Sequence, residues 1–252
     1  MEKVSKQVLL SRSLEEAIPF QQIDTDKLSI KGIPLIKFAQ YEDFHVERTL
    51  NTLHAFDWII FTSHNGIHYF FKTLEQYNHR LEELNHLRFG TVGSKTAETL
   101  KQHGFEVDFV PEVFDANQMG KQMLEEVEME NVLLVKGTRS RIVLDEMFEA
   151  HNIAFSNLIV YQTTTNSEVK HAVKQLLDDE LHAFVFTSPS SIQAYMELGE
   201  GLVKRTYHLP CFCIGETTAS YAREVGFEQI IIPEEYTIDS LALEVENYFK
   251  EG

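Results

Sequence analysis

The fold is decided by the stretch Phe61-Thr62-Ser63-His64-Asn65-Gly66-Ile67, which returns as Phe186-Thr187-Ser188-Pro189-Ser190-Ser191-Ile192 at an offset of 125 residues, the difference between 186 and 61. Each copy follows an apolar run, Trp58-Ile59-Ile60 in the first and Phe184-Val185 in the second. Apolar residues then continue at helical spacing, as in Ile67, Phe70, Phe71 and Leu74. Each copy therefore predicts a buried strand, a turn rich in hydroxyl side chains, and a helix.

Two further segments repeat in the same order. Val92-Gly93-Ser94-Lys95-Thr96-Ala97 corresponds to Ile214-Gly215-Glu216-Thr217-Thr218-Ala219 at an offset of 122, and Val8-Leu9-Leu10 corresponds to Val132-Leu133-Leu134 at an offset of 124. A period of this length is too long for a solenoid and indicates a duplicated domain. We therefore expect two lobes, which also suits a chain of 252 residues.

Buried strands are predicted wherever a short apolar run stands alone between turn and helix signals. The predicted strands are 8–10, 58–61, 89–92, 107–110, 132–135, 158–161, 184–186, 211–214 and 230–232. Their alternation with helices predicts an α/β fold with parallel sheets and right-handed crossovers.

Signals at the helix ends repeat as well. Asp115 and Thr237 are predicted to cap equivalent helices, and Pro189 fits a first helical position. Gly104 and Gly226 fit left-handed caps that close a helix before the next strand.

The composition narrows the classes of partner and location. The formal net charge is −17, whereas nucleic acids and anionic membranes reward a basic surface, so we expect neither as a partner. No apolar segment has the length of a membrane span, and the polar start lacks the core of a signal peptide; we expect a cytoplasmic protein. Cys211 and Cys213 are predicted to be buried thiols on one face of a strand, not a redox pair or a metal site.

Turns rich in Ser, Thr and Gly follow most of the predicted strands. In a parallel sheet they lie at the carboxyl edge, where ligands bind, and the N–H groups that open a helix favour carboxylates or phosphates. The candidate binding residues are Thr62, Ser63, Gly93, Ser94, Lys136, Gly137, Thr187, Ser188, Gly215, Thr217 and Thr218. The alternative is that each merely caps its own helix, for which these residue types are favoured. Their presence in both copies favours two lobes that bind one long ligand with many acid groups.

Basic residues at the same edges are few. Those that follow or enter the turns are Arg12, Lys95, Lys136, Arg139 and Arg141. They are candidates for pairing with an anion, and the alternative for each is a solvated surface position.

Other site signals are weak or missing. His64 and His68 have the spacing of a zinc pair, but no Glu stands between them and the other copy has Pro189 and Gln193 there; no metal site is predicted. The sequence has no phosphate-binding loop, no dinucleotide fingerprint and no nucleophile elbow. No nucleophile and no acid–base pair stands out.

Taken in order, the motifs resemble the uroporphyrinogen-III synthase family. The resemblance runs from the first strand, which ends in Arg12, to the last helix. The motifs are Phe61-Thr62-Ser63, Val92-Gly93-Ser94 with Thr96, Gly137 and Arg141 after a strand, Val160-Tyr161-Gln162-Thr163, Phe186-Thr187-Ser188, and Ile214-Gly215 with Thr217-Thr218-Ala219. His64 and Ser13 stand where the family often has Pro, and neither change removes a group that the chemistry needs.

The resemblance implies two flavodoxin-like parallel-sheet lobes joined by a two-segment linker. One lobe is then discontinuous and combines residues 1–38 with 166–252, while 42–161 form the inserted lobe. The linkers are expected at 37–41 and 161–165.

The resemblance also implies a reaction without a cofactor. Hydroxymethylbilane, a linear tetrapyrrole, loses its terminal hydroxyl as water, and the resulting azafulvene is attacked by the last pyrrole ring through its substituted position. A spiro intermediate then rearranges to uroporphyrinogen III with that ring inverted. Tyr161 matches the family's most discussed side chain and is the candidate donor to the leaving hydroxyl; its alternative role is packing between lobes. The turn residues named above, with Arg12 and Arg141, are the expected substrate contacts. We expect a monomer that contacts the preceding enzyme of the pathway transiently.

Two other functions fit the residues less closely. A non-catalytic bilobal anion-binding protein would use the same helix N-termini, and composition does not separate it from an enzyme. A two-lobed glycosyltransferase-like enzyme would need a nucleotide-sugar site with a clear catalytic group, and none stands out.

Overall fold

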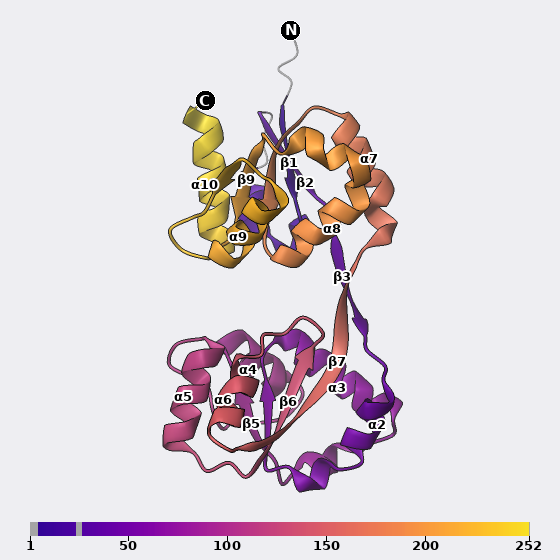
Figure 1. The fold of residues 1–252 in the computed structure, drawn as a ribbon, viewed down its shortest axis with the longest axis vertical. Coiled ribbons are helices and arrows are strands. Elements are labelled where there is room, and N and C mark those ends of the chain that lie inside the picture. Colours follow the sequence, from indigo (N-terminus) through magenta and orange to yellow (C-terminus); the bar gives the residue numbers. More distant parts are fainter. Residues whose placement is uncertain (1–4, 24–26, 252) are drawn as a thin grey trace. The chain divides into compact units, whose positions relative to one another are not determined.

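The computed structural model describes residues 5–23 and 27–251 of the chain (Figure 1). It divides into two compact units, unit 1 with Met1–Lys37 and Thr164–Gly252 and unit 2 with Phe38–Thr163. The chain leaves unit 1 within strand β3 (Ile36–Gln40) and returns within strand β7 (Ala154–Thr165). The segments expected as linkers are therefore largely strand.

Unit 1 is built on a parallel five-stranded sheet in the order β10-β9-β8-β1-β2. Its strands are β1 (Lys6–Leu10), β2 (Leu28–Gly32), β8 (Leu181–Phe186), β9 (Pro210–Cys213) and β10 (Gln229–Ile231). Its helices are α1 (Ile18–Gln22), α7 (Lys170–Asp178), α8 (Pro189–Gly199), α9 (Glu216–Val225) and α10 (Ile238–Glu251), with short 3-10 turns η1 (Leu14–Glu16), η4 (Ser167–Val169) and η5 (Glu200–Thr206).

Unit 2 has a five-stranded sheet in the order β3-β7-β6-β4-β5, in which β7, β6, β4 and β5 pair in parallel. Besides β3 and β7, the sheet contains β4 (Trp58–Phe61), β5 (Arg88–Thr91) and β6 (Asn131–Gly137). The helices are α2 (Phe44–Leu50), α3 (His64–Gln76), α4 (Ser94–Gln102), α5 (Ala116–Glu126) and α6 (Val143–Ala150), with 3-10 turns η2 (Leu53–Ala55) and η3 (Leu81–Leu84).

The sequence repeat appears in space as a shared strand order. The repeat matches β8 with β4, β9 with β5 and β1 with β6. In unit 1, β8 lies between β9 and β1, and in unit 2 the matching β4 lies between β5 and β6. The predicted α/β fold with parallel sheets is confirmed.

The central strands of each sheet are buried on both faces. Successive side chains of a strand point to opposite sides, and in these strands both sets of side chains are covered. In β4, Ile59 and Phe61 belong to one apolar cluster and Trp58 and Ile60 to another. In β9, both cysteines join one cluster while Phe212 joins the cluster on the other face. Cys211 and Cys213 are buried free thiols on one face, as predicted.

The predicted strand 107–110 is wrong. This segment makes a single bridge, between Phe109 and Gly90. The Asp108 carboxylate accepts the N–H of Phe89 at 2.8 Å, which takes a donor that a ladder carbonyl would otherwise use. The position equivalent to Asp108 in unit 1 is Ile230, which has no such acceptor and lies in β10.

The structure contains two strands that the sequence pattern did not predict, β2 and β3. In β2 buried and exposed residues alternate, as expected for an edge strand, so no continuous apolar run marks it. The helix-end signals were read correctly: Asp115 accepts from the N–H groups of Asn117 and Gln118, and Thr237 accepts from Ser240 N–H at 3.1 Å. Gly104 and Gly226 have φ of +87° and +109°, which glycine adopts without strain.

Candidate functional site

The predicted binding turns lie at the carboxyl edge of the parallel sheet of their own unit. In unit 1, Arg12 follows β1, the pair Thr187 and Ser188 follows β8, and Gly215 follows β9. In unit 2, the corresponding turns follow β4, β5 and β6, with Thr62 and Ser63, then Gly93 and Ser94, then Gly137. Each unit therefore gathers its candidate residues at one edge.

In the turns after β4 and β8, a serine caps the N-terminus of the following helix. Ser63 Oγ accepts the N–H of Gly66 at 3.1 Å, and Ser188 Oγ accepts the N–H of Ser191 at 3.2 Å. For these two hydroxyls the capping role is real, and each still has a proton to donate. Thr62 and Thr187 are half-buried beside them.

The second turn of each unit opens its helix without a side-chain cap. Gly93 precedes α4 and Gly215 precedes α9, and neither makes a side-chain cap bond. The first N–H groups of a helix need an acceptor, and glycine supplies none. Ser94 and Thr217 are exposed at these helix starts, whereas Thr218 is buried. Of the two kinds of turn, those that begin with glycine offer their helix no side-chain acceptor at the cap position.

The first residue of α9 is acidic, and its carboxylate is bound by side chains of the same helix. Glu216 opens α9, and Arg223 and Ser220 bind its carboxylate. The hydrogen bond from Arg223, followed by that from Ser220, lowers the pKa of Glu216 below its ordinary value. Its charge is thus partly compensated along the helix.

Tyr161 and Ser63 are brought together in unit 2, although 98 residues separate them. Tyr161 Oη lies 3.1 Å from Ser63 Oγ. Tyr161 is buried, and its backbone carbonyl accepts the N–H of Thr138 at 3.0 Å. Tyr161 is therefore held at its backbone carbonyl by the turn after β6 and at its hydroxyl by the start of α3.

The Tyr161 ring is fitted against a glycine and two aromatic rings. A Cβ built on Gly137 would lie 2.4 Å from Cζ of Tyr161, so only glycine leaves room for the phenol. Tyr69 stacks on the ring at 5.6 Å between centroids and Phe38 meets it edge-on at 5.7 Å. Burial raises the pKa of the Tyr69 phenol. The apolar stripe of α3 predicts Ile67 and Phe70, and gave no sign of Tyr69.

Lys136, a predicted anion contact, is paired with a carboxylate of the protein itself. Its side chain is only 6% exposed, and its Nζ lies 2.6 Å from Asp145 Oδ2 and 2.8 Å from Oδ1. Asn157 Nδ2 donates to the same carboxylate at 2.6 Å. Because Asp145 already compensates the charge, the pair first of all fixes the end of β6 to α6. Arg139 and Arg141 in the next turn are exposed.

Arg12 retains unused donor capacity. Its Nε is buried and has no hydrogen-bond partner among the described residues. A buried donor left unpaired costs free energy, and an anion bound at this position would recover that cost. Beside it, Ser11 Oγ accepts the N–H of Thr187 at 3.3 Å, a link between two turns that the sequence analysis missed.

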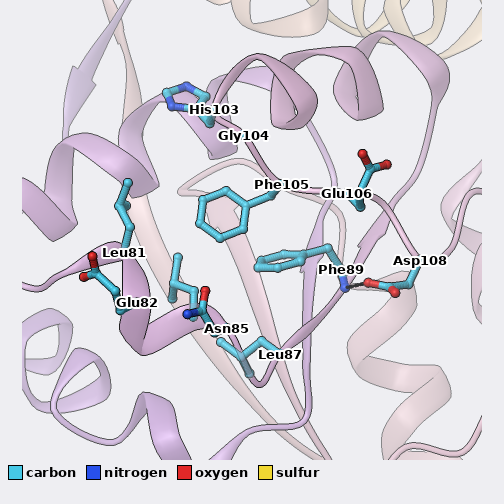
Figure 2. Close-up of a pocket in the computed structure, with 11 residues that line it drawn as sticks. Leu81, Glu82, Asn85, Leu87, Phe89, His103, Gly104, Phe105, Glu106 and Asp108 are labelled. Atoms are coloured by element: carbon cyan, nitrogen blue, oxygen red, sulfur yellow. Dashed lines mark hydrogen bonds between the residues drawn. The ribbon is translucent and has the colours of Figure 1, made fainter.

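A separate hollow of about 450 Å³ lies in unit 2 beside the start of β5 (Figure 2). Figure 2 shows Phe89 and Phe105 facing into it, with His103 and Glu106 on its rim. None of the predicted site residues lines it, because it borders the start of β5 whereas they follow strand ends.

The chain is similar to proteins of one known family over most of its length. The family model described as uroporphyrinogen-III synthase HemD matches residues 31–242. The chain belongs to the uroporphyrinogen-III synthase family. The family expected from the order of the motifs is thus confirmed, and both glycine-capped helices fall inside the matched region.

Relatives of the family cover nearly the whole chain. The uroporphyrinogen-III synthase of Chlorobaculum parvum is 29% identical over 242 residues, which are 94% of this chain and 96% of that protein. The porphyrin biosynthesis protein HemD of Ruminiclostridium josui is 28% identical over 88% of this chain, which spans only 43% of that protein. The crystal structure of the Helicobacter pylori uroporphyrinogen-III synthetase has the same fold, with a TM-score of 0.63 at 22% identity over 97% of this chain and 99% of that one.

None of the helices within residues 5–23 and 27–251 combines the length and the hydropathy of a membrane-spanning segment.

Proposed function

We propose that this chain cyclises hydroxymethylbilane to uroporphyrinogen III with release of water, as a lyase of tetrapyrrole biosynthesis. The observation that carries the proposal is the pair of equivalent helices α4 and α9, each of which begins after a glycine that offers the first N–H groups of the helix no side-chain acceptor. A substrate with many acid groups along a flexible chain suits several such donors, whereas a small anion needs one.

The binding residues act by folding the substrate. Backbone donors after Gly93 and Gly215 hold acetate and propionate groups, and Arg12 adds a charged donor. Holding the chain in a ring-like shape brings the substituted carbon of the last pyrrole near the electrophilic carbon, which accelerates ring closure by proximity. The substrate itself supplies the reacting electrons.

Tyr161 assists the departing hydroxyl through a directed chain of hydrogen bonds. Gly66 N–H donates to Ser63 Oγ, and with Ser63 O–H donating to Tyr161 Oη the phenol proton is left for the substrate. Each bond polarises the next in such a chain, and its first member belongs to the positive end of helix α3. The C–O bond then breaks as the hydroxyl takes the phenol proton and leaves as water, and the proton that the pyrrole N–H gives up when the azafulvene forms restores the phenol.

We expect the Tyr161→Phe variant to lower kcat by about 100-fold, because the donor to the leaving group is lost. Ser63→Ala should lower kcat by about tenfold, because the phenol is retained but no longer polarised. Steady-state kinetics on freshly generated hydroxymethylbilane would measure both. A Tyr161→Phe enzyme that keeps both its melting temperature and its full kcat would remove Tyr161 from the mechanism.

The activity is tested in cells by complementation. A bacterial strain that lacks its own uroporphyrinogen-III synthase needs supplied haem, and this chain should restore growth without it. A well-expressed, folded chain that fails to restore growth would favour the alternative of a non-catalytic anion-binding protein. The monomeric state, the cytoplasmic location and the transient contact with the preceding enzyme stay predictions.

A further inference from the structure

Two exposed aromatic side chains stand at equivalent positions of the two units. Phe114 and Tyr236 are 60% and 62% exposed, and they are separated by 122 residues, the same offset that relates Gly93 to Gly215. Phe114 follows the segment 107–110 in unit 2 and directly precedes the helix cap Asp115. Tyr236 follows β10 in unit 1 and directly precedes the helix cap Thr237. The repeat therefore preserves an exposed ring at a candidate ligand edge.

Both aromatic residues lie against the glycine of the uncapped helix start. A Cβ built on Gly215 would lie 2.8 Å from Cδ2 of Tyr236, closer than real Cβ contacts come. The same construction on Gly93 lies 3.5 Å from Cβ and 3.6 Å from Cγ of Phe114, an ordinary contact. In each unit, one aromatic residue therefore borders the N–H groups that we assign to substrate carboxylates.

Helix capping alone does not account for the exposure of these rings. An apolar residue just before a helix cap often packs on the residue four positions into the helix. Those residues, Met119 and Leu241, are fully buried, yet more than half of each aromatic side chain remains in water. Exposing a large apolar ring forgoes the free energy that burial would give, and that loss is incurred twice, at matching positions.

We propose that Phe114 and Tyr236 are positioning residues that pack on pyrrole rings of the linear tetrapyrrole; this rests on the function proposed above. Hydroxymethylbilane carries its acid groups on the rims of flat rings, so a site for it needs anion donors beside flat apolar surfaces. Aromatic side chains supply such surfaces and pair with other rings in stacked or edge-on arrangements. Each unit then offers both elements within one turn, the donors after the glycine and the ring over it.

The kinetic test removes each ring singly. Phe114→Ala and Tyr236→Ala should each raise KM by about 3- to 10-fold with kcat changed less than about twofold, the range expected for one ring–ring contact. Tyr236→Phe keeps the ring and should keep the wild-type KM. Phe44→Ala is the matched control, because Phe44 is an exposed phenylalanine of unit 2 whose ring packs against that of His45; its KM should not change.

Leucine variants keep the test decisive if an alanine variant unfolds. Phe114→Leu and Tyr236→Leu retain apolar bulk without a flat face, and they should raise KM as the alanine variants do. Folded Phe114 and Tyr236 variants with wild-type KM would overturn the inference while leaving the proposed function intact. A wild-type chain that yields only the spontaneous isomer of uroporphyrinogen would instead overturn the proposed function, and this inference with it.

Discussion

Replacing Asp145 with alanine should lower the free energy of unfolding by about 3–5 kcal/mol, because it leaves the buried ammonium of Lys136 without a counter-charge. Lys136 is buried within β6 and its Nζ contacts both carboxylate oxygens of Asp145. In a chain of this length the loss corresponds to a fall of about 10 °C in the melting temperature. Thermal unfolding followed by circular dichroism would measure it.

Two controls separate the buried pair from ion pairs in general. Glu246→Ala removes the partner of Lys250 on the surface of α10, where the lysine side chain is 64% exposed, and it should cost less than about 1 kcal/mol. Lys136→Met combined with Asp145→Leu should recover most of the stability lost in Asp145→Ala, since both charges are then removed. An Asp145→Ala protein as stable as Glu246→Ala would contradict the assigned role of the pair.

Gly137→Ala should abolish most of the activity, with a loss of kcat at least equal to that of Tyr161→Phe, about 100-fold. The new methyl carbon would lie 2.4 Å from Cζ and 2.5 Å from Cε2 of Tyr161. The rigid ring must move, which breaks the hydrogen bond between Tyr161 and Ser63. Overpacking of this kind also costs about 1–3 kcal/mol of stability.

Gly201→Ala is the matched control for the added methyl group. Nothing lies within 4 Å of a Cβ at Gly201, and its φ lies outside the left-handed region. This variant should keep wild-type kcat and melting temperature. Wild-type kcat in a folded Gly137→Ala protein would mean that the position of the Tyr161 ring does not matter for the reaction.

The sequence predicts those strands that are buried on both faces and preceded or followed by clear turn residues. The predicted runs 58–61 and 184–186, which lie in β4 and β8, are examples, because a parallel sheet covered on both faces requires continuous apolar runs. Leu28–Gly32 escaped because an edge strand alternates. The segment 107–110 has a strand-like pattern, and the Asp108 side chain, whose bond to Phe89 is non-local, decides against it.

The candidate site was predictable as a set of turns and not as a set of contacts. Ser63 and Gly215 stand after strands at repeat-matched offsets, which local pattern reveals. The bond between Ser63 and Tyr161 joins residues 98 apart, and the repeat cannot predict it. For Lys136 the pattern predicts only a candidate for pairing with an anion, because nothing in residues 136–145 indicates that Asp145 turns back toward it.

An enzyme of the proposed function directs hydroxymethylbilane to uroporphyrinogen III. The most direct measurement supplies the purified chain with freshly generated hydroxymethylbilane, oxidises the porphyrinogens formed, and separates the isomers by chromatography against a reaction without protein. We predict mainly isomer III with the wild-type chain, and a shift toward isomer I with Tyr161→Phe as the spontaneous reaction overtakes it. Isomer I alone from the folded wild-type chain, in the amount formed without protein, would contradict the account.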